Sequence, residues 1–215
     1  MTQRSTGGAI AGRAPSLIPA LLVLAAGMGA GVTPARAQVV FTPMAGTMVP
    51  TANVYEQPGA IGTARQTTAF AAGGRLTLSA TGHVGLEAGL IWAPSNVRIT
   101  TTAGTVDRSS SMLLGSLRLI FVLNSRWDAV NVYFAAGAGL VRRSGDAFTD
   151  VDGLTDVTGN VAFGTLFRAG SAFRIRLEME DYLYQTRFTL PGGEQPGPRF
   201  QNDLVFSLGV SIPII

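Results

Sequence analysis

The sequence of 215 residues contains no cysteine, no lysine and a single histidine. Without cysteine, the chain can form no disulfide bond and offers no thiolate for catalysis or metal binding. Charged residues make up only 13% of the chain, about half of their usual share in soluble domains. Hydrophobic residues account for 47%, and the 27 glycines favour a tightly packed sheet over a helical fold. The length favours a single domain.

The first 37 residues have the three parts of a secretory signal peptide: a charged beginning, an apolar centre and a cleavage site between small residues. These parts are Arg4 and Arg13, the apolar stretch 16–32, and Ala35 and Ala37. The alternative is an N-terminal transmembrane anchor, but the apolar stretch is short for one and rich in glycine and alanine. We therefore predict a signal peptide at 1–37 and a mature domain at 38–215.

The formal charge of +3 comes from this leader, which holds three of the 16 basic residues and none of the 13 acidic ones. The mature chain is therefore neutral overall. A neutral chain gives no compositional support for nucleic-acid binding, and we expect no nucleic-acid partner.

Alternation of apolar and polar residues with a period of two dominates the mature chain, and this pattern predicts β-strands. In the run 83–93, for example, Leu86, Leu90 and Trp92 share one face, whereas Gly85 and Glu87 lie on the other. The eight predicted strands are 39–49, 68–79, 83–93, 112–123, 129–141, 160–168, 173–180 and 204–212.

The connections between these strands alternate in length. Short turns at 80–82, 124–128 and 169–172 alternate with long polar loops near 50–67, 95–111, 143–157 and 185–201. This pattern predicts an all-β, eight-stranded, antiparallel, up-and-down transmembrane β-barrel with both ends of the mature chain on the periplasmic side. The apolar face would meet lipid. The other face, with its small residues and paired Arg and Glu, would fill the narrow lumen.

Hairpin register predicts which lumen charges meet. A three-residue turn after Ser79 pairs Ser79 with His83 and therefore places Arg75 opposite Glu87. A symmetric loop centred near residues 102–103 places Glu87 opposite Arg118. We expect these three residues to begin a lumen charge network that comprises Arg75, Glu87, Arg118, Arg168, Arg174, Arg176, Glu178 and Glu180.

Aromatic residues fall near the predicted strand ends, as in the girdles of transmembrane barrels. The outer girdle would contain Trp92, Tyr182, Tyr184 and Phe188, and the inner one Trp127, Phe167 and Phe173. By parity, Tyr182 could face the lumen instead.

Motifs for chemistry are weak. His83 lies at a predicted periplasmic turn. A catalytic base needs a nucleophile within hydrogen-bond reach, so this histidine alone does not indicate catalysis.

Four aspartates of the third long loop could offer oxygen ligands to calcium, but they lack the EF-hand spacing and indicate a solvated loop. These are Asp146, Asp150, Asp152 and Asp156. Gly137-Ala138-Gly139 lacks the third glycine of a dinucleotide fingerprint, and lumen glycines packed under Arg and Tyr explain it better. We expect no enzyme activity, no cofactor and no metal.

Two segments carry a family resemblance: Tyr133 to Leu140 (YFAAGAGL) and Arg176 to Tyr182 (RLEMEDY). Together with the signal peptide, eight strands and four long loops, they resemble the OmpA/OmpX-like and OmpW-like outer membrane protein β-barrels. The resemblance implies a Gram-negative outer membrane, contact with the lipid bilayer and lipopolysaccharide, and delivery to the outer-membrane assembly machinery. The chain departs from such barrels at its end, SIPII, where an aromatic residue is usual.

The resemblance carries no catalytic residue and leaves two functions open. The first is a structural or surface-interaction role for a monomeric barrel whose lumen is filled by Arg, Glu and small residues. The alternative is an OmpW-like transport barrel for small solutes, apolar ones among them. A soluble, lipocalin-like barrel is a third hypothesis. Because paired charges fill an eight-stranded interior, a plugged lumen is favoured over an open pore.

Overall fold

The computed structural model describes residues 38–56, 62–79, 83–124, 128–149, 151–170, 172–187, 189 and 197–214. The predicted signal peptide at 1–37 lies outside these residues. Within them, ten antiparallel strands form one sheet. The elements are β1 (Gln38–Pro50), β2 (Asn53–Glu56), β3 (Gly62–Gln66), β4 (Ala69–Ser79), β5 (Val84–Thr101), β6 (Gly104–Val122), β7 (Val130–Ser144), the 3-10 turn η1 (Asp146–Phe148), β8 (Thr155–Arg168), β9 (Arg174–Thr186) and β10 (Arg199–Pro213). No helix in the described ranges is long and apolar enough to cross a bilayer.

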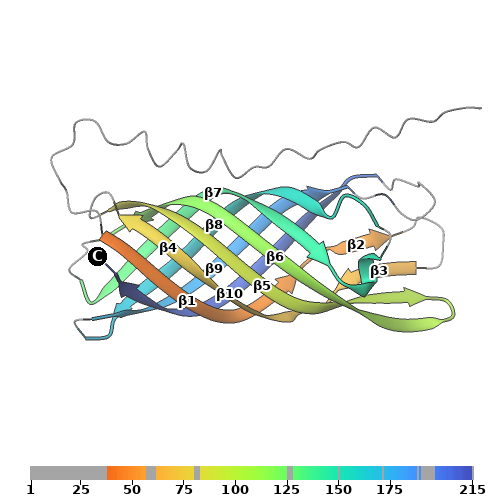
Figure 1. The fold of residues 1–215 in the computed structure, drawn as a ribbon, viewed down its shortest axis with the longest axis horizontal. Coiled ribbons are helices and arrows are strands. Elements are labelled where there is room, and N and C mark those ends of the chain that lie inside the picture. The colour runs from red at the N-terminus through yellow and green to blue at the C-terminus, as the bar shows by residue number, and fades with distance from the viewer. Residues whose placement is uncertain are drawn as a thin grey trace, which may run out of the picture. The chain divides into compact units, whose positions relative to one another are not determined.

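Eight of these described strands close into a barrel (Figure 1). The ring runs β1, β4, β5, β6, β7, β8, β9, β10, and β10 pairs back with β1. Because each ring strand is paired on both sides, the ring leaves no open sheet edge toward lipid. The predicted eight-stranded up-and-down barrel is confirmed. The two remaining strands belong to the first long connection, where β3 pairs with the part of β5 that extends beyond the first residues of β4.

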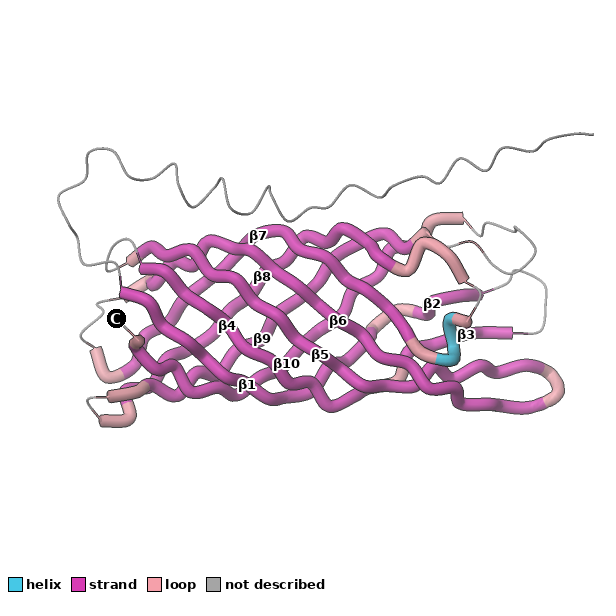
Figure 2. The backbone as a smooth tube through the Cα atoms, in the orientation of Figure 1, coloured by secondary structure: helices cyan, strands magenta, loops and turns pink. Residues whose placement is uncertain are grey.

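The barrel has two different ends, which the tube in Figure 2 shows clearly. Short connections join β4 to β5, β6 to β7 and β8 to β9 at one end, where β1 begins and β10 finishes. We call this the short-turn end and the opposite one the long-loop end. In outer-membrane barrels the short turns face the periplasm and the long loops face the exterior.

The loop predicted at 95–111 is wrong, because β5 and β6 continue through it as a hairpin that turns after Thr101. The strands have 18 and 19 residues, more than a membrane-spanning strand needs. Threonine, valine and isoleucine in this segment favour a strand. Arg98 and Asp107 pair across the hairpin, with both donor–acceptor distances 2.9 Å. The Arg98 hydrogen bond lowers the pKa of the Asp107 carboxyl.

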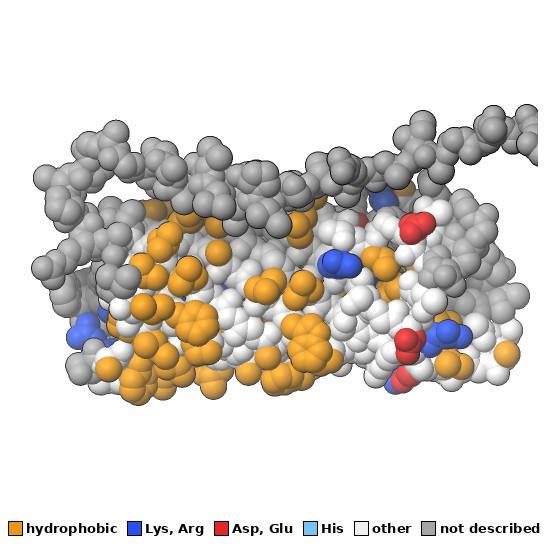
Figure 3. All heavy atoms as spheres, viewed as in Figure 1, with side chains coloured by type: hydrophobic (Ala, Val, Ile, Leu, Met, Phe, Trp, Pro, Cys, Tyr) orange, Lys and Arg blue, Asp and Glu red, His pale blue; other side chains and the backbone are white. Residues whose placement is uncertain are grey.

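The apolar face of the ring points outward, as predicted. Leu117 on β6 is 45% exposed and Trp92 on β5 is 52% exposed, whereas the residues on either side of each in the sequence are buried. In Figure 3, hydrophobic side chains cover the visible wall from the short-turn end to its middle, and most charged side chains lie toward the long-loop end. So large an apolar surface requires lipid. The soluble, lipocalin-like hypothesis is wrong, because it needs the apolar face inside.

Two tyrosines assigned to the outer girdle lie in the lumen instead. Tyr182 and Tyr184 are 0% and 3% exposed, because they share the inward parity of the charged residues of β9. Phe167 and Phe173 are exposed near the short-turn end, where the inner girdle was expected. Two further girdle positions, Trp127 and Phe188, lie outside the described residues.

Small lumen residues leave room for large ones on the neighbouring strand. Gly164 lies opposite Tyr133, and a Cβ atom at Gly164 would collide with the phenol oxygen. Similarly, a Cβ atom at Gly137 would lie only 2.5 Å from the Cα atom of Arg118. Glycine at these positions therefore sets the close approach of strands in the narrow barrel.

The lipid-facing wall yields a stability prediction. Leu117→Arg would place a charge near the middle of the apolar belt and should lower the free energy of unfolding in liposomes by about 2–4 kcal/mol. Val106→Arg is the matched control, because Val106 is exposed on the hairpin beyond the belt and should tolerate the change. Urea titration of both variants measures the difference. Equal losses would contradict the assignment of this wall to lipid.

The lumen charge cluster as candidate functional site

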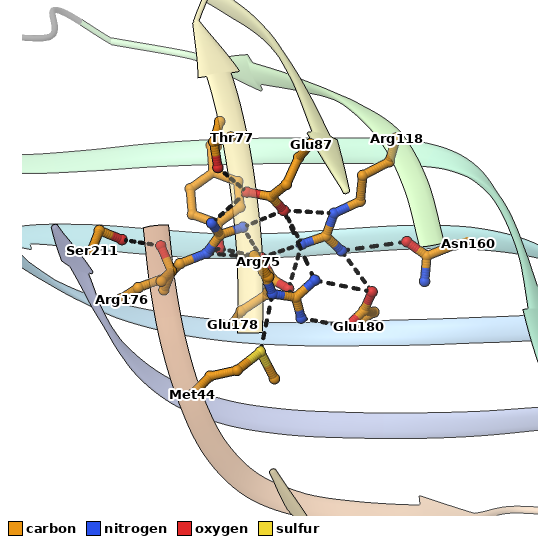
Figure 4. Close-up of polar contacts among 12 residues, drawn as sticks. Met44, Arg75, Thr77, Glu87, Arg118, Asn160, Arg176, Glu178, Glu180 and Ser211 are labelled. Carbon is orange, nitrogen blue, oxygen red and sulfur yellow. Dashed lines mark hydrogen bonds and ion pairs between the residues drawn. The ribbon is translucent and has the colours of Figure 1, made fainter. Parts of the chain in front are cut away.

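Six charged side chains meet inside the barrel, and we call them the central cluster (Figure 4). They come from four strands, β4, β5, β6 and β9, and each is at most 5% exposed. Their inward position follows from strand parity, which turns their apolar neighbours toward lipid. The members are Arg75, Glu87, Arg118, Arg176, Glu178 and Glu180.

Glu87 is held by two guanidinium groups from different sides of the lumen. Arg118 Nη2 lies 2.6 Å from Glu87 Oε1, and Arg176 Nη1 lies 2.6 Å from Glu87 Oε2. Thr77 donates a further hydrogen bond to Oε2 at 2.6 Å. All three partners donate hydrogen bonds to the carboxylate of Glu87. They therefore stabilise its ionised form in place of water.

The two glutamates of β9 are held in the same way. Arg75 Nη2 lies 2.7 Å from Glu178 Oε1 and 2.5 Å from Glu180 Oε2. Arg118 reaches the same pair, with Nη2 2.7 Å from Glu178 and Nη1 2.8 Å from Glu180. Each arginine of this pair therefore bridges strands that face each other across the lumen.

The central cluster is electrically neutral, with three arginines and three glutamates. Burial of an isolated charge is very costly, whereas a fully hydrogen-bonded, balanced set is tolerated. Each carboxylate accepts bonds from at least two guanidinium groups, so none is presented to a substrate as a base. The arrangement is suited to closing the lumen and fixing the strands around it.

Of the two strand pairings predicted for the start of the lumen charge network, the structure confirms one. Glu87 lies opposite Arg118, which is the register of a hairpin centred on residues 102–103. The expected pairing of Arg75 with Glu87 is wrong by two residues, because Ser79 pairs with Gly85 rather than with His83. A shift of two keeps the same face, and the long Arg75 side chain still comes within 3.8 Å of Glu87.

Two of the expected network residues, Arg168 and Arg174, lie nearer the short-turn end, opposite each other on β8 and β9. Arg174 Nη1 donates to the buried Asn131 side-chain oxygen at 3.1 Å. Both arginines line a pocket that opens beside the central cluster, and Arg176 forms part of the same wall.

Comparison of the sequence with protein-family models and with curated proteins finds no match. Solved structures do match. The outer membrane protein OprG from Pseudomonas aeruginosa has a TM-score of 0.65 at 12% identity, over 83% of this chain and 96% of that one. The E. coli Outer Membrane Protein W has a TM-score of 0.54 at 18% identity, over 84% and 100%. Neisserial surface protein A has a TM-score of 0.53 at 12% identity, over 81% and 96%.

The chain has the fold of a small outer-membrane β-barrel. At these identities the likeness concerns the fold alone. It agrees with the closed ring, the outward apolar face and the short-turn and long-loop ends. The resemblance to OmpW-like barrels that the sequence suggested is matched at the level of structure.

Sequence reasoning missed the residues that complete the cluster of this outer-membrane barrel. Tyr133 donates a short hydrogen bond to Glu178 and accepts one from Arg176 Nε at 2.7 Å. Asn160 accepts from Arg118 at 3.3 Å, and Met44 Sδ lies 3.1 Å from Arg75 Nε. Strand parity could have placed these side chains in the lumen. It does not indicate which residues they contact there.

A buried apolar layer fills the lumen between the central cluster and the long-loop end, and sequence reasoning missed it too. Its side chains are at most 1% exposed. They include Met48, Ile91, Met112, Leu114, Val141, Tyr182 and Val205. The prediction of a lumen filled by charges and small residues is therefore incomplete, because large apolar side chains share the inward face.

The aspartates of the third long loop are separated by the structure. Asp156 is not solvated, since it is buried and lies 3.1 Å from Arg143 Nη1. Asp146 is exposed and accepts a hydrogen bond from Ser109 at 2.8 Å, whereas Asp150 lies outside the described residues. Among the described residues, no group of three or more potential ligands could hold a metal ion.

The single histidine lies where the sequence placed it, at the short-turn end of the outer-membrane barrel. His83 is exposed, and its Nδ1 lies 3.1 Å from the carbonyl oxygen of Val122. It lines the same pocket as Arg168 and Arg174.

The central cluster yields a prediction about stability. Arg118→Met leaves three buried glutamates with two arginines, so it should cost about 3–5 kcal/mol of unfolding free energy. Arg98→Met removes the arginine of the exposed hairpin pair, so its loss should be too small to resolve. Adding Glu87→Gln to Arg118→Met should recover part of the loss, because the remaining cluster is neutral again.

Urea unfolding in liposomes measures all three variants. If Arg118→Met does not assemble, Arg118→Lys keeps the charge without the planar fork and should give a smaller, measurable loss. A loss for Arg118→Met no larger than that for Arg98→Met would show that the cluster contributes nothing to stability.

Proposed function

We propose that the protein is a closed structural barrel of the outer membrane that offers its long-loop end for surface interactions and conducts no solute along its axis. The observation that carries this proposal is the occupied lumen. Arg176 and Glu87 approach within 2.6 Å across the centre, and Arg75 and Arg118 bridge the remaining walls. A side-chain network of this kind leaves no continuous channel in an eight-stranded barrel.

The apolar layer supports the same conclusion. Ile91, Leu114 and Tyr182 lie directly beyond the central cluster and are fully buried. An ion or polar solute that passed the cluster would next have to enter a layer of buried, mostly apolar side chains, which is energetically unfavourable. Two obstacles of opposite chemistry therefore follow each other along the axis.

The hairpin of β5 and β6 supports the interaction role. Residues 101–109 are all exposed, and the hairpin projects at the long-loop end in Figure 1. Exposed loops and hairpins on a rigid scaffold are the usual carriers of binding function. Arg98 and Asp107 form an exposed ion pair across this hairpin.

The proposal includes the remaining expectations from the sequence. Residues 1–37 act as a cleaved signal peptide that delivers the chain to the outer-membrane assembly machinery. The folded barrel is a monomer in contact with lipid and lipopolysaccharide. It has no enzyme activity, no cofactor and no nucleic-acid partner. Transport of small solutes, apolar ones among them, is the alternative and requires the opposite result in the experiment below.

Conductance tests the closed lumen. The purified protein in planar bilayers should show no resolvable channel, and liposomes that contain it should not admit small sugars or a short-chain apolar dye. Glu87→Ala combined with Arg176→Ala removes a lumen ion pair without changing net charge and should raise the leak. Arg98→Ala combined with Asp107→Ala removes the hairpin pair and should not. Discrete conductance steps or solute flux in the unaltered protein would favour transport.

Processing tests the leader. Protein extracted from the outer membrane should have Gln38 as its first residue by intact mass and N-terminal sequencing. Ala37→Glu places a large acidic residue at the cleavage position and should leave the precursor uncut, whereas Arg36→Gln should be processed normally. Uncut protein from the unaltered gene in the outer membrane would contradict the signal peptide.

A further inference from the structure

An acidic residue lies on the outer, apolar wall of the barrel. Asp181 on β9 points outward, since its sequence neighbours Glu180 and Tyr182 are buried in the lumen. The next outward residues around it are all apolar: Met179 and Leu183 on the same strand, and Val161 and Leu204 opposite it on β8 and β10. Asp181 therefore lies within the wall that faces lipid. An ionisable side chain at such a position is costly and often marks a functional site.

Hydrogen bonds along the outer wall join Asp181 to the long-loop end of the barrel. Asn202 Nδ2 on β10 donates to Asp181 Oδ2 at 2.9 Å. Thr51, just beyond the end of β1, places its Oγ1 3.2 Å from Asn202 Oδ1 and 2.7 Å from the Asn202 carbonyl oxygen. Asp181 Oδ1 is buried without a donor among the described residues, and Oδ2 can accept a second hydrogen bond. The carboxyl group therefore has unused acceptor capacity.

An apolar groove of about 490 Å³ adjoins Asp181 on its short-turn side. Leu177 and Met179 of β9 line it, and both are 45% exposed, so the groove opens toward lipid. Its sides include Phe163 on β8 and Phe206 on β10, the direct sheet partners of Met179. Asp181 is the next outward residue of β9 after Met179, about 7 Å further along the strand. The groove therefore leads toward a polar group.

The groove and the carboxyl group together fit an acyl chain that carries a hydrogen-bond donor near its head. Because the groove faces the bilayer, an apolar chain fills it. A plain hydrocarbon chain offers no donor to Asp181, and an ester linkage offers only acceptors. A hydroxyl group on the chain, or an amide that joins the chain to its head group, supplies the donor. Asp181 lies nearer to the long-loop end of β9 than to its beginning, so this lipid belongs to the outer leaflet.

We propose that the outer wall of β8, β9 and β10 binds a lipid of the outer leaflet with hydroxylated or amide-linked acyl chains, which is the chemistry of the lipid part of lipopolysaccharide. One chain lies in the groove beside Met179, and its hydroxyl or amide N–H group donates to Asp181. The inference rests on the outer-membrane setting of the proposed function but not on the closed lumen, so lipid binding and conductance can fail independently.

Methionine methyl NMR of the protein in dimyristoylphosphatidylcholine nanodiscs tests the site. Of the methionines after the leader, Met179 lies in the groove, whereas Met44, Met48 and Met112 are buried in the lumen. The probes are methyl 3-hydroxytetradecanoate and methyl tetradecanoate, which differ by one hydroxyl group. The hydroxylated ester should shift the Met179 signal saturably. Its half-saturating mole fraction should be lower by about threefold or more, because only this ester donates a hydrogen bond. The three lumen signals should stay in place.

Variants of the wall separate the hydrogen bond from the shape of the groove. Asp181→Leu removes the acceptor and should abolish the preference for the hydroxylated ester. Asp181→Asn keeps an acceptor oxygen and should retain a preference of about twofold or more. Thr165→Val is the matched control, because it removes a polar group from the same groove beside Leu177, away from Asp181. It should leave the preference unchanged. Unshifted lumen methionine signals show that each variant is folded.

Equal half-saturation by the two esters, a preference that survives Asp181→Leu, or the absence of a saturable Met179 shift would overturn the proposal. Lipid A added to the nanodiscs should shift the same signal in the unaltered protein and not in Asp181→Leu, and its failure to do so would overturn the assignment to this lipid class. A Met179 shift that follows the number of barrels per nanodisc instead of the added lipid would assign the groove to a second copy of the chain.

Discussion

The pairing of β10 with β1 is the constraint on which the rest of the molecule depends. It removes the last open edge of the sheet, so that lipid meets only side chains and never an unpaired backbone group. Closure with eight strands also fixes a lumen too narrow for bulk water. A charged side chain in the middle of the lumen must then find its partners inside the protein. The Arg and Glu residues of the interior satisfy this requirement by pairing with one another.

The interior that results is layered. A pocket lined by polar and apolar residues opens at the short-turn end, the neutral central cluster follows, and a buried apolar layer with Ile91 and Leu114 lies beyond it. Nearer the long-loop end, a second polar group joins Arg143, Asp156 and Tyr184. The layers close the centre of the barrel and leave two different ends. The short-turn end contains a pocket, and the long-loop end carries the projecting hairpin of β5 and β6.

Much of this architecture could be predicted from the sequence, because period-two alternation assigns both the strands and their faces. The pairing of Glu87 with Arg118 could also be predicted. A symmetric hairpin has the same register whether the residues around its centre form an open loop or continue as paired strands. Arg75 was misplaced because a slip of two residues leaves every side chain on its face, so parity cannot detect it. The hydrogen bond of Tyr133 on β7 with Glu178 on β9 passes over Gly164 of β8, and Asp156 is buried against Arg143 and Thr186 of its two neighbouring strands. No pattern along the chain encodes such distances.

The central cluster has a consequence for the fidelity of assembly. Its ion pairs join residues as far apart in the sequence as Arg75 and Glu180, so they form only when the sheet curls round on itself. Backbone hydrogen bonds alone would accept a ring that closed two residues out of step, because each face would keep its polarity. In such a ring the guanidinium and carboxylate groups would be displaced from one another in a medium of low dielectric constant. The cluster therefore favours one register of closure, and with it one shear of the barrel, among the registers that hydrophobicity alone would permit.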